Sequence, residues 1–349
     1  MVLKIGSEII MSSKKRLSDI AKELNVSVVT VSNALNDRAG VSDEMRAKIK
    51  ELASRFRYKN EVLKEKAYKK TNNIAVIVSE RQFDPRNMTQ SFYLGFYENF
   101  SRCFLANDYC AILVTVSKED EKEGNILKLI REKKFEGIIL LGKIKKEYIE
   151  KLSETALPMV LVDFYYDEVQ HRCVLTDNIE GSYTVTNLLI KKGHKEIGFV
   201  GRIGETSSIN DRYIGYYKAM FEHKLPINDA YIIPDRDEQG IYNIGKLPQK
   251  LPTAFVCNSD RAAYELYQQL KQRGLKVGED ISVVGFDDDI FARLCEPQLT
   301  TVAVNINKIT KVAEEILISE IEHPTKTSGK ISVPGTIIER QSIKDISLI

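Results

Sequence analysis

Hydrophobic and polar positions follow two different patterns, one on each side of residue 73. Within residues 17–57, apolar residues recur every three or four positions, which is the spacing of helices. From Ile74 onward, short apolar runs rich in β-branched residues alternate with charged segments of helical spacing. The pattern predicts a small all-α unit followed by an α/β unit whose parallel sheets are covered by helices on both faces.

Seven apolar runs of the second unit are predicted to be strands. They are IAVIV, CAILVTV, FEGIILLG, PMVLVDF, IGFVG, TAFVC and ISVVGFD. About 275 residues is large for one doubly wound sheet, so we expect two lobes with a cleft between them. Ligands of such folds bind outside the carboxyl ends of strands, where several of these runs meet polar residues. These residues are Asp163, Asn258-Ser259-Asp260 and Asp287-Asp288-Asp289.

The stretch VSVVTVSNALN, residues 26–36, is ambiguous because its β-branched residues favour a strand by propensity. It follows LSDIAKEL, which has helical spacing, and Asn25, a residue that tolerates the left-handed conformation of a tight turn. Helix, short turn and helix form the helix-turn-helix pattern. We therefore predict a second helix here, against the local propensity, with Ser27 at its N-cap.

On this second helix, Val31, Ala34 and Leu35 share the face toward the other helices. The opposite face carries two valines, which could contact thymine methyl groups, and an asparagine, which could bond a base edge or a phosphate. Hydroxyl groups near the helix start suit phosphate oxygens. The candidate DNA-binding residues here are Ser27, Val28, Val29, Thr30, Ser32 and Asn33. The alternative is that both valines are buried in a larger core.

Charge divides the chain at the same place. Residues 1–70 carry 16 Lys and Arg and 9 Asp and Glu, whereas the remainder carries 35 and 40. A small basic unit on a mildly acidic body suggests that only the basic unit contacts a polyanion such as nucleic acid.

Several classes of protein find no support. No run of about 18 apolar residues could span a membrane, and residues 1–16 lack the features of a secretion signal, so we expect a cytoplasmic protein. Met11 could be an alternative start. No phosphate loop, dinucleotide fingerprint, nucleophile elbow or HExxH motif occurs, so we expect no enzyme and no cofactor. The five cysteines and four histidines are too dispersed to predict a metal site.

The segments LSDIAKELNVSVVTVSNALN and GVSDEMRAKIKELASRFRY resemble the DNA-binding head of the lac/gal repressor family of bacterial transcription regulators. TDNIEGSYTVTNLLIKKGHKEIGFVG, DRYIGY, FVCNSDRAA and DISVVGFDD resemble segments of its effector-binding core, in the same order. The resemblance implies a small three-helix helix-turn-helix head and an α/β two-lobed core like that of periplasmic binding proteins. The expected parts are a disordered extension (1–11), the helix-turn-helix domain (12–57), a hinge or linker (58–73) and the effector-binding and dimerisation core (74–349).

The resemblance also implies an effector pocket. Arg212 matches an arginine that grips effector oxygens, and Asp287 matches an aspartate that accepts hydrogen bonds from the ligand. Ser259 departs from an asparagine usual in the family. The expected effector-binding residues are Phe92, Tyr93, Asp163, Arg212, Tyr242, Ser259, Asp260 and Asp287. The alternatives are a solvated acidic loop for Asp287, Asp288 and Asp289, ordinary core aromatics for Phe92 and Tyr93, and a surface pair with Asp211 for Arg212.

The linker YKNEVLKEKAYKK departs from the family pattern, which has a proline and a leucine that wedges into the minor groove. Here Lys66 stands near the leucine position, and an ammonium cannot wedge between base steps. Either Leu63 substitutes or the linker contacts phosphates without the usual kink, and we expect Lys66 to contact DNA.

These features predict a ligand-responsive transcriptional repressor of a sugar-utilisation operon. We expect a homodimer that reads a palindromic operator in double-stranded DNA, with no membrane partner. No heptad repeat follows ERQS, which favours a dimer over a tetramer. The expected effector is a small molecule, a sugar such as a galactoside, with a purine or phosphosugar left open. A solute-binding transport protein and a glycosidase are the alternatives from other classes.

Overall fold

The computed structural model describes residues 17–35, 38–55, 71–86, 89–117, 119–120, 130, 134–238, 240–325 and 327–347. The chain divides into two compact units, residues 1–70 and 71–349, called here the head and the core. The predictions for residues 1–11, for most of the linker and for Lys66 and Leu63 lie outside the described residues.

The head consists of α1 (Leu17–Glu23), α2 (Val28–Leu35) and α3 (Asp43–Arg55). The valine run is therefore a helix, as predicted against its propensity. Its turn is made by Asn25, whose φ of 49° lies in the left-handed region, and its start is capped by Ser27, whose Oγ accepts from Thr30 N–H at 2.9 Å. The three helices bury one shared hydrophobic core. Its buried members are Ile20, Ala21, Val31, Ala34, Ile49, Leu52 and Ala53.

The C-terminal end of α2 is held by a side chain from α3. The Arg46 guanidinium donates to the carbonyl oxygens of Asn33 at 3.4 Å, Ala34 at 3.3 Å and Arg38 at 2.7 Å. The last carbonyl groups of a helix have no partner within the helix, and a cation there also offsets the helix dipole. Arg46 thus fixes the position of α2 on α3.

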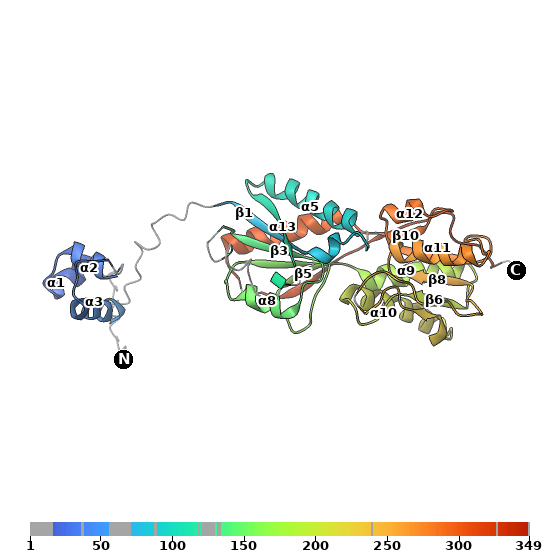
Figure 1. Ribbon diagram of the computed structural model, residues 1–349, viewed down its shortest axis with the longest axis horizontal. Helices are drawn as coiled ribbons and strands as arrows, with labels where there is room; N and C mark the ends of the chain where they lie inside the picture. The colour runs from blue at the N-terminus through green and yellow to red at the C-terminus, as the bar shows by residue number, and fades with distance from the viewer. Residues whose placement is uncertain are drawn as a thin grey trace, which may run out of the picture. The chain divides into compact units, whose positions relative to one another are not determined.

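The first sheet of the core forms the N-lobe, and its order within the described residues is β11-β5-β4-β3-β1-β2, all parallel. Its strands are β1 (Asn73–Ser79), β2 (Cys110–Val116), β3 (Gly137–Leu141), β4 (Met159–Val162), β5 (Arg172–Thr176) and β11 (Gly329–Val333). Helix α8 (Lys146–Ser153) covers one face, and α5 (Gln90–Leu105) and α13 (Ile306–Glu322) cover the other (Figure 1). A short 3-10 helix, η1 (Glu80–Phe83), follows β1.

The second sheet forms the C-lobe in the order β12-β10-β9-β8-β6-β7, parallel except for the β10–β12 pair. Its strands are β6 (Ile197–Val200), β7 (Ile232–Ile233), β8 (Ala254–Cys257), β9 (Ser282–Asp287), β10 (Thr300–Ala303) and β12 (Thr336–Ile338). Helices α9 (Asn178–Lys191) and α10 (Ser207–Glu222) cover one face, and α11 (Asp260–Gln272) and α12 (Ile290–Leu294) the other (Figure 1). A 3-10 helix, η2 (Asp229–Tyr231), precedes β7.

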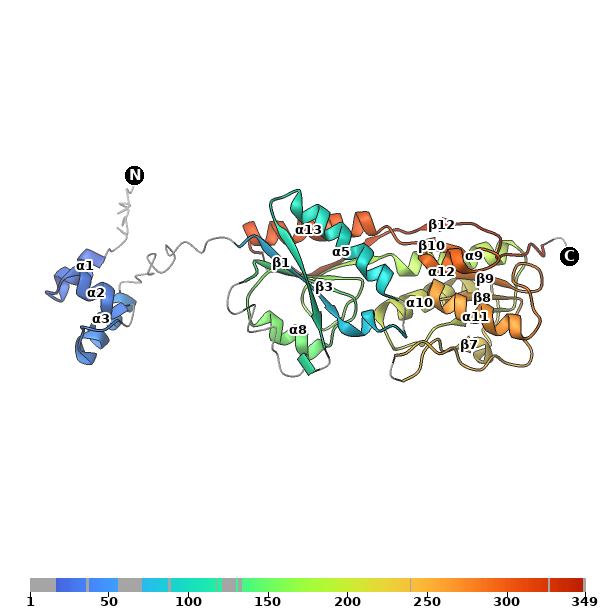
Figure 2. The same cartoon turned by 45° about the horizontal axis from the view of Figure 1, so that its top comes forward.

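In the described part of the core, the chain passes between the lobes at three places. They lie between β5 and α9, between β10 and α13, and between β11 and β12. Figure 2 shows the last two, in red, running between the lobes. The segments that follow β1, β3 and β4 of one lobe line a common cavity with those that follow β6, β7 and β8 of the other. This is the cleft that strand ends predicted.

All seven predicted strands are present, as β1, β2, β3, β4, β6, β8 and β9. Five further strands of the described residues were not expected: β5, β7, β10, β11 and β12. They are short, and four of them, β5, β10, β11 and β12, adjoin the crossings between the lobes. The predicted fold class is confirmed.

Candidate functional site

The outer face of α2 is the first candidate site. Val28 and Val29 are 45% and 66% exposed, whereas Val31 and Ala34 on the inner face are fully buried. Two neighbouring aliphatic side chains exposed on a well-packed helix gain nothing from the fold of the head. The alternative, that both valines are core residues, is therefore wrong for the head itself.

The polar candidates flank these valines. The Ser27 hydroxyl caps α2 and also lies 2.8 Å from the Thr30 hydroxyl, so both hydroxyl groups have a partner within the head. Ser32 and Asn33 are half-buried. The Asn33 backbone oxygen accepts from Arg38 N–H at 2.9 Å and from Arg46, which holds the residue in place.

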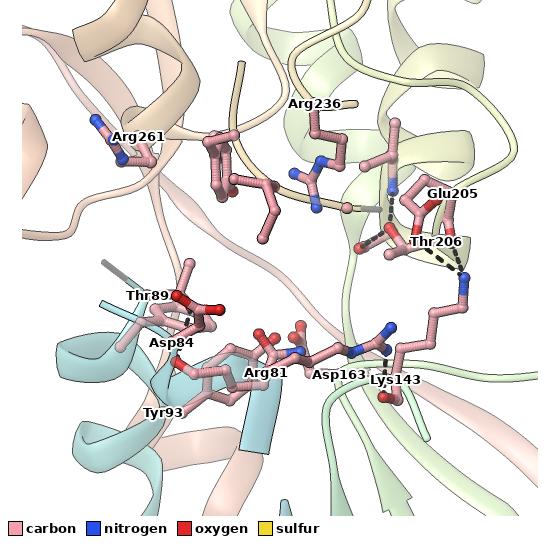
Figure 3. Close-up of a pocket in the computed structure, with 18 of the residues that line it drawn as sticks. Arg81, Asp84, Thr89, Tyr93, Lys143, Asp163, Glu205, Thr206, Arg236 and Arg261 are labelled. Carbon is pink, nitrogen blue, oxygen red and sulfur yellow. Dashed lines mark hydrogen bonds and ion pairs between the residues drawn. The ribbon is translucent and has the colours of Figure 1, made fainter. Parts of the chain in front are cut away.

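The second candidate site is a cavity of about 740 Å³ between the lobes of the core. Seven of the eight predicted effector residues line it: Phe92, Tyr93, Asp163, Arg212, Tyr242, Ser259 and Asp287. They come from both lobes. Its size and its mixture of aromatic and polar walls are typical of small-molecule sites. Figure 3 shows N-lobe residues on one side of the cavity and Arg236, Glu205 and Thr206 of the C-lobe on the other.

Arg212 is buried in the C-lobe wall, and all three of its guanidinium nitrogens have protein partners. Nε donates to Asn178 Oδ1 at 2.8 Å, Nη1 donates to the Asn258 carbonyl oxygen, and Nη2 lies 3.1 Å from Asp287 Oδ1. The guanidinium carbon lies 3.7 Å from the centre of the Phe286 ring. The alternative of a surface pair with Asp211 is wrong. Arg212 is therefore held in the cavity wall, and two of its five guanidinium N–H groups are not used by the contacts given above.

The two carboxylates nearest this arginine sit at unusual backbone positions. The φ angles of Asp163 and Asp287 are 69° and 115°, which side chains with a Cβ rarely adopt. Such conformations persist where the surrounding structure enforces them, and they cluster at ligand sites. Both residues end or follow a buried strand, β4 and β9, so the solvated-loop alternative for Asp287 is wrong.

Burial also changes the acidity of these groups. It raises the pKa of Asp163 to about 6, with Arg212 and the Tyr93 hydroxyl opposing the rise. It raises the pKa of Asp287 to about 7, where Arg212 opposes and Asp163 adds to the effect. Both carboxyl groups therefore exchange protons near neutral pH.

The aromatic wall is fixed by close packing. Phe92 and Tyr93 make an edge-to-face pair with ring centres 5.4 Å apart, and Phe92 makes another with Phe96 at 5.3 Å. Phe92 thus belongs to the N-lobe core and to the cavity. The Tyr93 ring lies over Gly142, whose φ is 71°, and a Cβ there would approach the ring to 2.8 Å. Glycine is required at 142 on both counts.

Asp260 differs from its prediction, and Ser259 has a structural role in addition to its place in the cavity wall. Ser259 lines the cavity, but its Oγ caps α11 by accepting from Ala262 N–H at 3.2 Å. Asp260 is fully buried and does not line the cavity; its carboxylate accepts from the Thr301 hydroxyl at 2.6 Å and from Asp289 N–H at 2.9 Å. Its predicted effector contact is corrected to a supporting role, because the start of α11 turns the side chain toward β10.

Residues 16–61 match the model of the bacterial regulatory proteins of the lacI family, and residues 186–343 match that of a periplasmic binding protein-like domain. The HTH-type transcriptional regulator RegA of Clostridium saccharobutylicum is 30% identical over 336 residues, which cover 93% of this chain and 98% of RegA. The chain belongs to the lacI family. The ribose operon repressor of Haemophilus influenzae is 27% identical over a region that covers 94% of this chain and 98% of that repressor.

A solved complex of the regulator CelR with cellobiose is 19% identical, covers 94% of this chain and 99% of that chain, and has a TM-score of 0.66. This likeness shows the shared fold. As a lacI-family member, the protein is a transcriptional regulator and not an enzyme. None of the helices within the described ranges has the length and hydropathy that crossing a bilayer requires. No group of three or more metal-ligating side chains occurs among the same residues.

This lacI-family cavity contains charged residues that sequence reasoning missed. Lys143, after β3, reaches across to the C-lobe, where its Nζ donates to the Glu205 backbone oxygen and lies 3.3 Å from Glu205 Oε1 (Figure 3). Arg81 of η1 donates to the Lys143 backbone oxygen at 2.5 Å. Arg236 and Arg261 line the C-lobe side. Arg81 and Lys143 follow the predicted strands IAVIV and FEGIILLG, and Arg261 lies in the segment FVCNSDRAA, whereas Arg236 lies in no motif and after no predicted strand.

Proposed function

We propose that this regulator is a homodimeric repressor of a sugar-utilisation operon, acting in the cytoplasm. The α2 helices of its two heads read a palindromic operator, with Lys66 of the linker on the DNA backbone. Binding of a sugar in the core cavity causes the dimer either to release the operator or to stay bound to it. One observation carries the proposal: the same chain exposes two valines on a capped helix and encloses a cavity of strand-end carboxylates, arginine and aromatic rings.

The head supports the DNA half of the proposal. Val28 and Val29 suit thymine methyl groups, and the basic balance of residues 1–70 supplies the sequence-independent attraction. One helix of eight residues reads few bases, so two heads on a palindrome are needed for a specific site.

The core supports the sugar half. Phe92, Tyr93 and Tyr242 offer ring faces to the apolar side of a pyranose, and carboxylates and arginine offer acceptors and donors to its hydroxyls. The ribose operon repressor and the CelR–cellobiose complex are named for sugars, which supports this effector class. A galactoside is the first ligand to try.

The test uses the full chain and duplex DNA selected by it from a random pool. We expect selection of a palindrome, a dimer by sedimentation, salt-dependent affinity and a change in affinity with at least one of a panel of sugars that includes galactosides. The double substitution Val28→Ala/Val29→Ala should weaken binding to the selected site by about 10- to 100-fold and should weaken binding to random DNA far less. The matched control is Ile214→Ala, an aliphatic residue 49% exposed on α10. Equal losses in both variants, or selection of no sequence, would contradict the proposal.

A further inference from the structure

Arg236 stands on the C-lobe wall in a hairpin that no sequence pattern predicted. Its backbone pairs with Tyr242 in an antiparallel bridge, and Asp237 N–H donates to the Ile241 oxygen and Asn243 N–H to the Asp235 oxygen, both at 2.9 Å. This pairing sets the guanidinium carbon 4.5 Å from the centre of the Tyr242 ring. Figure 3 shows the guanidinium directed into the cavity, toward the N-lobe.

A buried carboxylate holds this guanidinium in place. Arg236 Nε donates to both Asp235 oxygens at 3.1 Å, and Nη2 to Oδ2 at 2.6 Å. Asp235 is fully buried and also accepts from Arg202 N–H at 2.8 Å and Asn258 Nδ2 at 2.9 Å. Burial raises the pKa of Asp235, but the charge and hydrogen bonds of Arg236, with those of Asn258 and Arg202, outweigh it and lower the pKa. The pair is therefore charged and rigid.

Two of the three arginines that line the C-lobe wall, Arg212 and Arg236, differ in the donors they have left. Arg212 uses all three nitrogens on Asn178, Asn258 and Asp287. Arg236 uses Nε and Nη2 on Asp235, and its Nη1 has no hydrogen-bond partner among the described residues. Of the five guanidinium N–H groups, more remain available on Arg236 for a ligand.

One asparagine connects the two. The Asn258 backbone oxygen accepts from Arg212, and its side-chain amide donates to Asp235, which holds Arg236. The run from Asp287 through Arg212, Asn258 and Asp235 to Arg236 is continuous and lies in one wall. Both guanidinium groups are thus positioned by one network before a ligand arrives, which reduces the entropy cost of binding.

Five of the cations that line the cavity are each paired with a carboxylate. Arg212 pairs with Asp287, Arg236 with Asp235, Lys143 with Glu205, Arg86 with Asp84 and Arg261 with Glu265. An anionic ligand that bound one of these five cations would have to take it from its carboxylate and leave that carboxylate unpaired. An uncharged ligand rich in hydroxyl groups takes the remaining N–H donors and carboxylate lone pairs without breaking any pair.

We propose that Arg236 is a second effector-binding residue which, with Arg212, selects an uncharged polyhydroxy ligand and sets its specificity through Nη1 and the Tyr242 ring. This rests on the proposed function, since it names the ligand class of the same cavity. In this proposal, Arg236 makes the ligand contact that distinguishes one sugar from another. Arg212 mainly holds the cavity wall together through its contacts with protein groups.

The experiment measures binding of uncharged sugars to the full chain by calorimetry, together with the phosphate and uronate forms of each. For the tightest uncharged sugar, Arg236→Gln should weaken binding by about 10- to 100-fold, since about one to two hydrogen bonds from a charged group are lost. Arg236→Lys keeps a cation beside Asp235 and should lose at least tenfold, because an ammonium lacks the fork. The control Lys250→Gln removes an exposed C-lobe cation, itself paired with Glu196, and should change nothing.

A deoxy series of the same sugar sharpens the test. One deoxy analogue should bind the wild-type chain more weakly yet bind Arg236→Gln and wild type alike, because the hydroxyl that Arg236 reads is already absent. Wild-type-like sugar binding in both Arg236 variants, strict additivity across the deoxy series, tighter binding of the charged forms, or no binding by any uncharged sugar would overturn the inference. DNA selection and dimerisation are independent of these results, so they report on the proposed function separately.

Discussion

The outer face of α2 and the cavity of the core are built in opposite ways. Every candidate of the α2 surface lies within residues 27–33, and two neighbouring aliphatic side chains, Val28 and Val29, are exposed there. The cavity gathers residues from the ends of strands in both lobes, and its arginines Arg212 and Arg236 are paired with the carboxylates of Asp287 and Asp235. A surface that reads a large, rigid partner can be short and simple. A site for a small molecule must be assembled from distant segments and held in place by its own network.

The largest expected effect is in the cavity network. Arg212→Gln leaves Asp287 without its cation and removes the contact with Phe286, so the free energy of unfolding of the core should fall by about 3 kcal/mol. Denaturant unfolding of the full chain, followed by tyrosine fluorescence, measures the loss. Lys250→Gln, at an exposed pair, should leave the midpoint unchanged. A stable Arg212→Gln core would show that the wall does not depend on this pair.

In the head, a single side chain, Arg46, holds the candidate DNA-binding helix α2 in place. Arg46→Ala removes the donors to the last carbonyl groups of α2 and should lower the free energy of unfolding of the head by about 2 kcal/mol. DNA affinity should fall with it, whereas unfolding of the core and sugar affinity should not change. Arg46→Lys, which keeps the charge at the helix end, should recover part of the loss. Loss of sugar binding in Arg46→Ala would contradict the expectation that this arginine acts on the head alone.

The pH dependence of sugar binding separates the two sites further. The pKa values of about 6 for Asp163 and about 7 for Asp287 lie above the usual aspartate value because of burial. Both groups lose protons as the pH rises from about 5 to 8, and ionised carboxylates accept stronger hydrogen bonds from sugar hydroxyls. Sugar affinity should therefore rise by up to about tenfold over this window.

The same shifts predict the opposite trend for stability of the unliganded core. The folded state holds protons that the unfolded state has released, so this stabilising contribution is complete below about pH 4 and is lost as the pH rises through 6 to 7. Sugar affinity should rise in two steps, one near the pKa of each carboxyl group. Asparagine tolerates the positive φ of position 163, so Asp163→Asn should remove the step at lower pH. An affinity independent of pH would show that neither carboxylate bonds the ligand.

The smallest expected effect concerns the bridge between the lobes. Lys143→Met removes the ion pair with Glu205, whose side chains are 27% and 22% exposed, and should weaken sugar binding by about threefold through a smaller population of the closed cleft. Stability of the core should hardly change. Arg102→Met, which removes an exposed pair with Glu98 on α5 alone, is the control. Equal effects of the two substitutions would deny Lys143 a role in closure.

How much could be predicted from the sequence follows from the same comparison. The α2 surface was predictable residue by residue, because helical periodicity and the break at Asn25 are local features. Its one hidden element was Arg46, since contacts with the end of another helix leave no periodic signal.

In the cavity, the rule that strand ends carry ligand residues located Asp163, Arg212's partner Asp287 and the cluster at Asn258. Arg236 was missed because β7, the strand before it, has only two residues and its hairpin depends on pairing with Tyr242. Asp260 was misplaced because sequence cannot tell which side of a strand end a side chain takes. The resemblance identified positions, and only the fold showed which donors are already used.

The central claim is that sugar in the core and DNA on the head influence one another's binding. The most direct measurement is reciprocal: the dissociation constant of the selected operator with and without saturating sugar, and that of the sugar with and without saturating operator. Linkage requires both ratios to be equal, and we expect a factor of about 5 to 150. Equal ratios in this range are the predicted result. Two ratios of one would contradict the account, since the chain would then bind DNA and sugar independently.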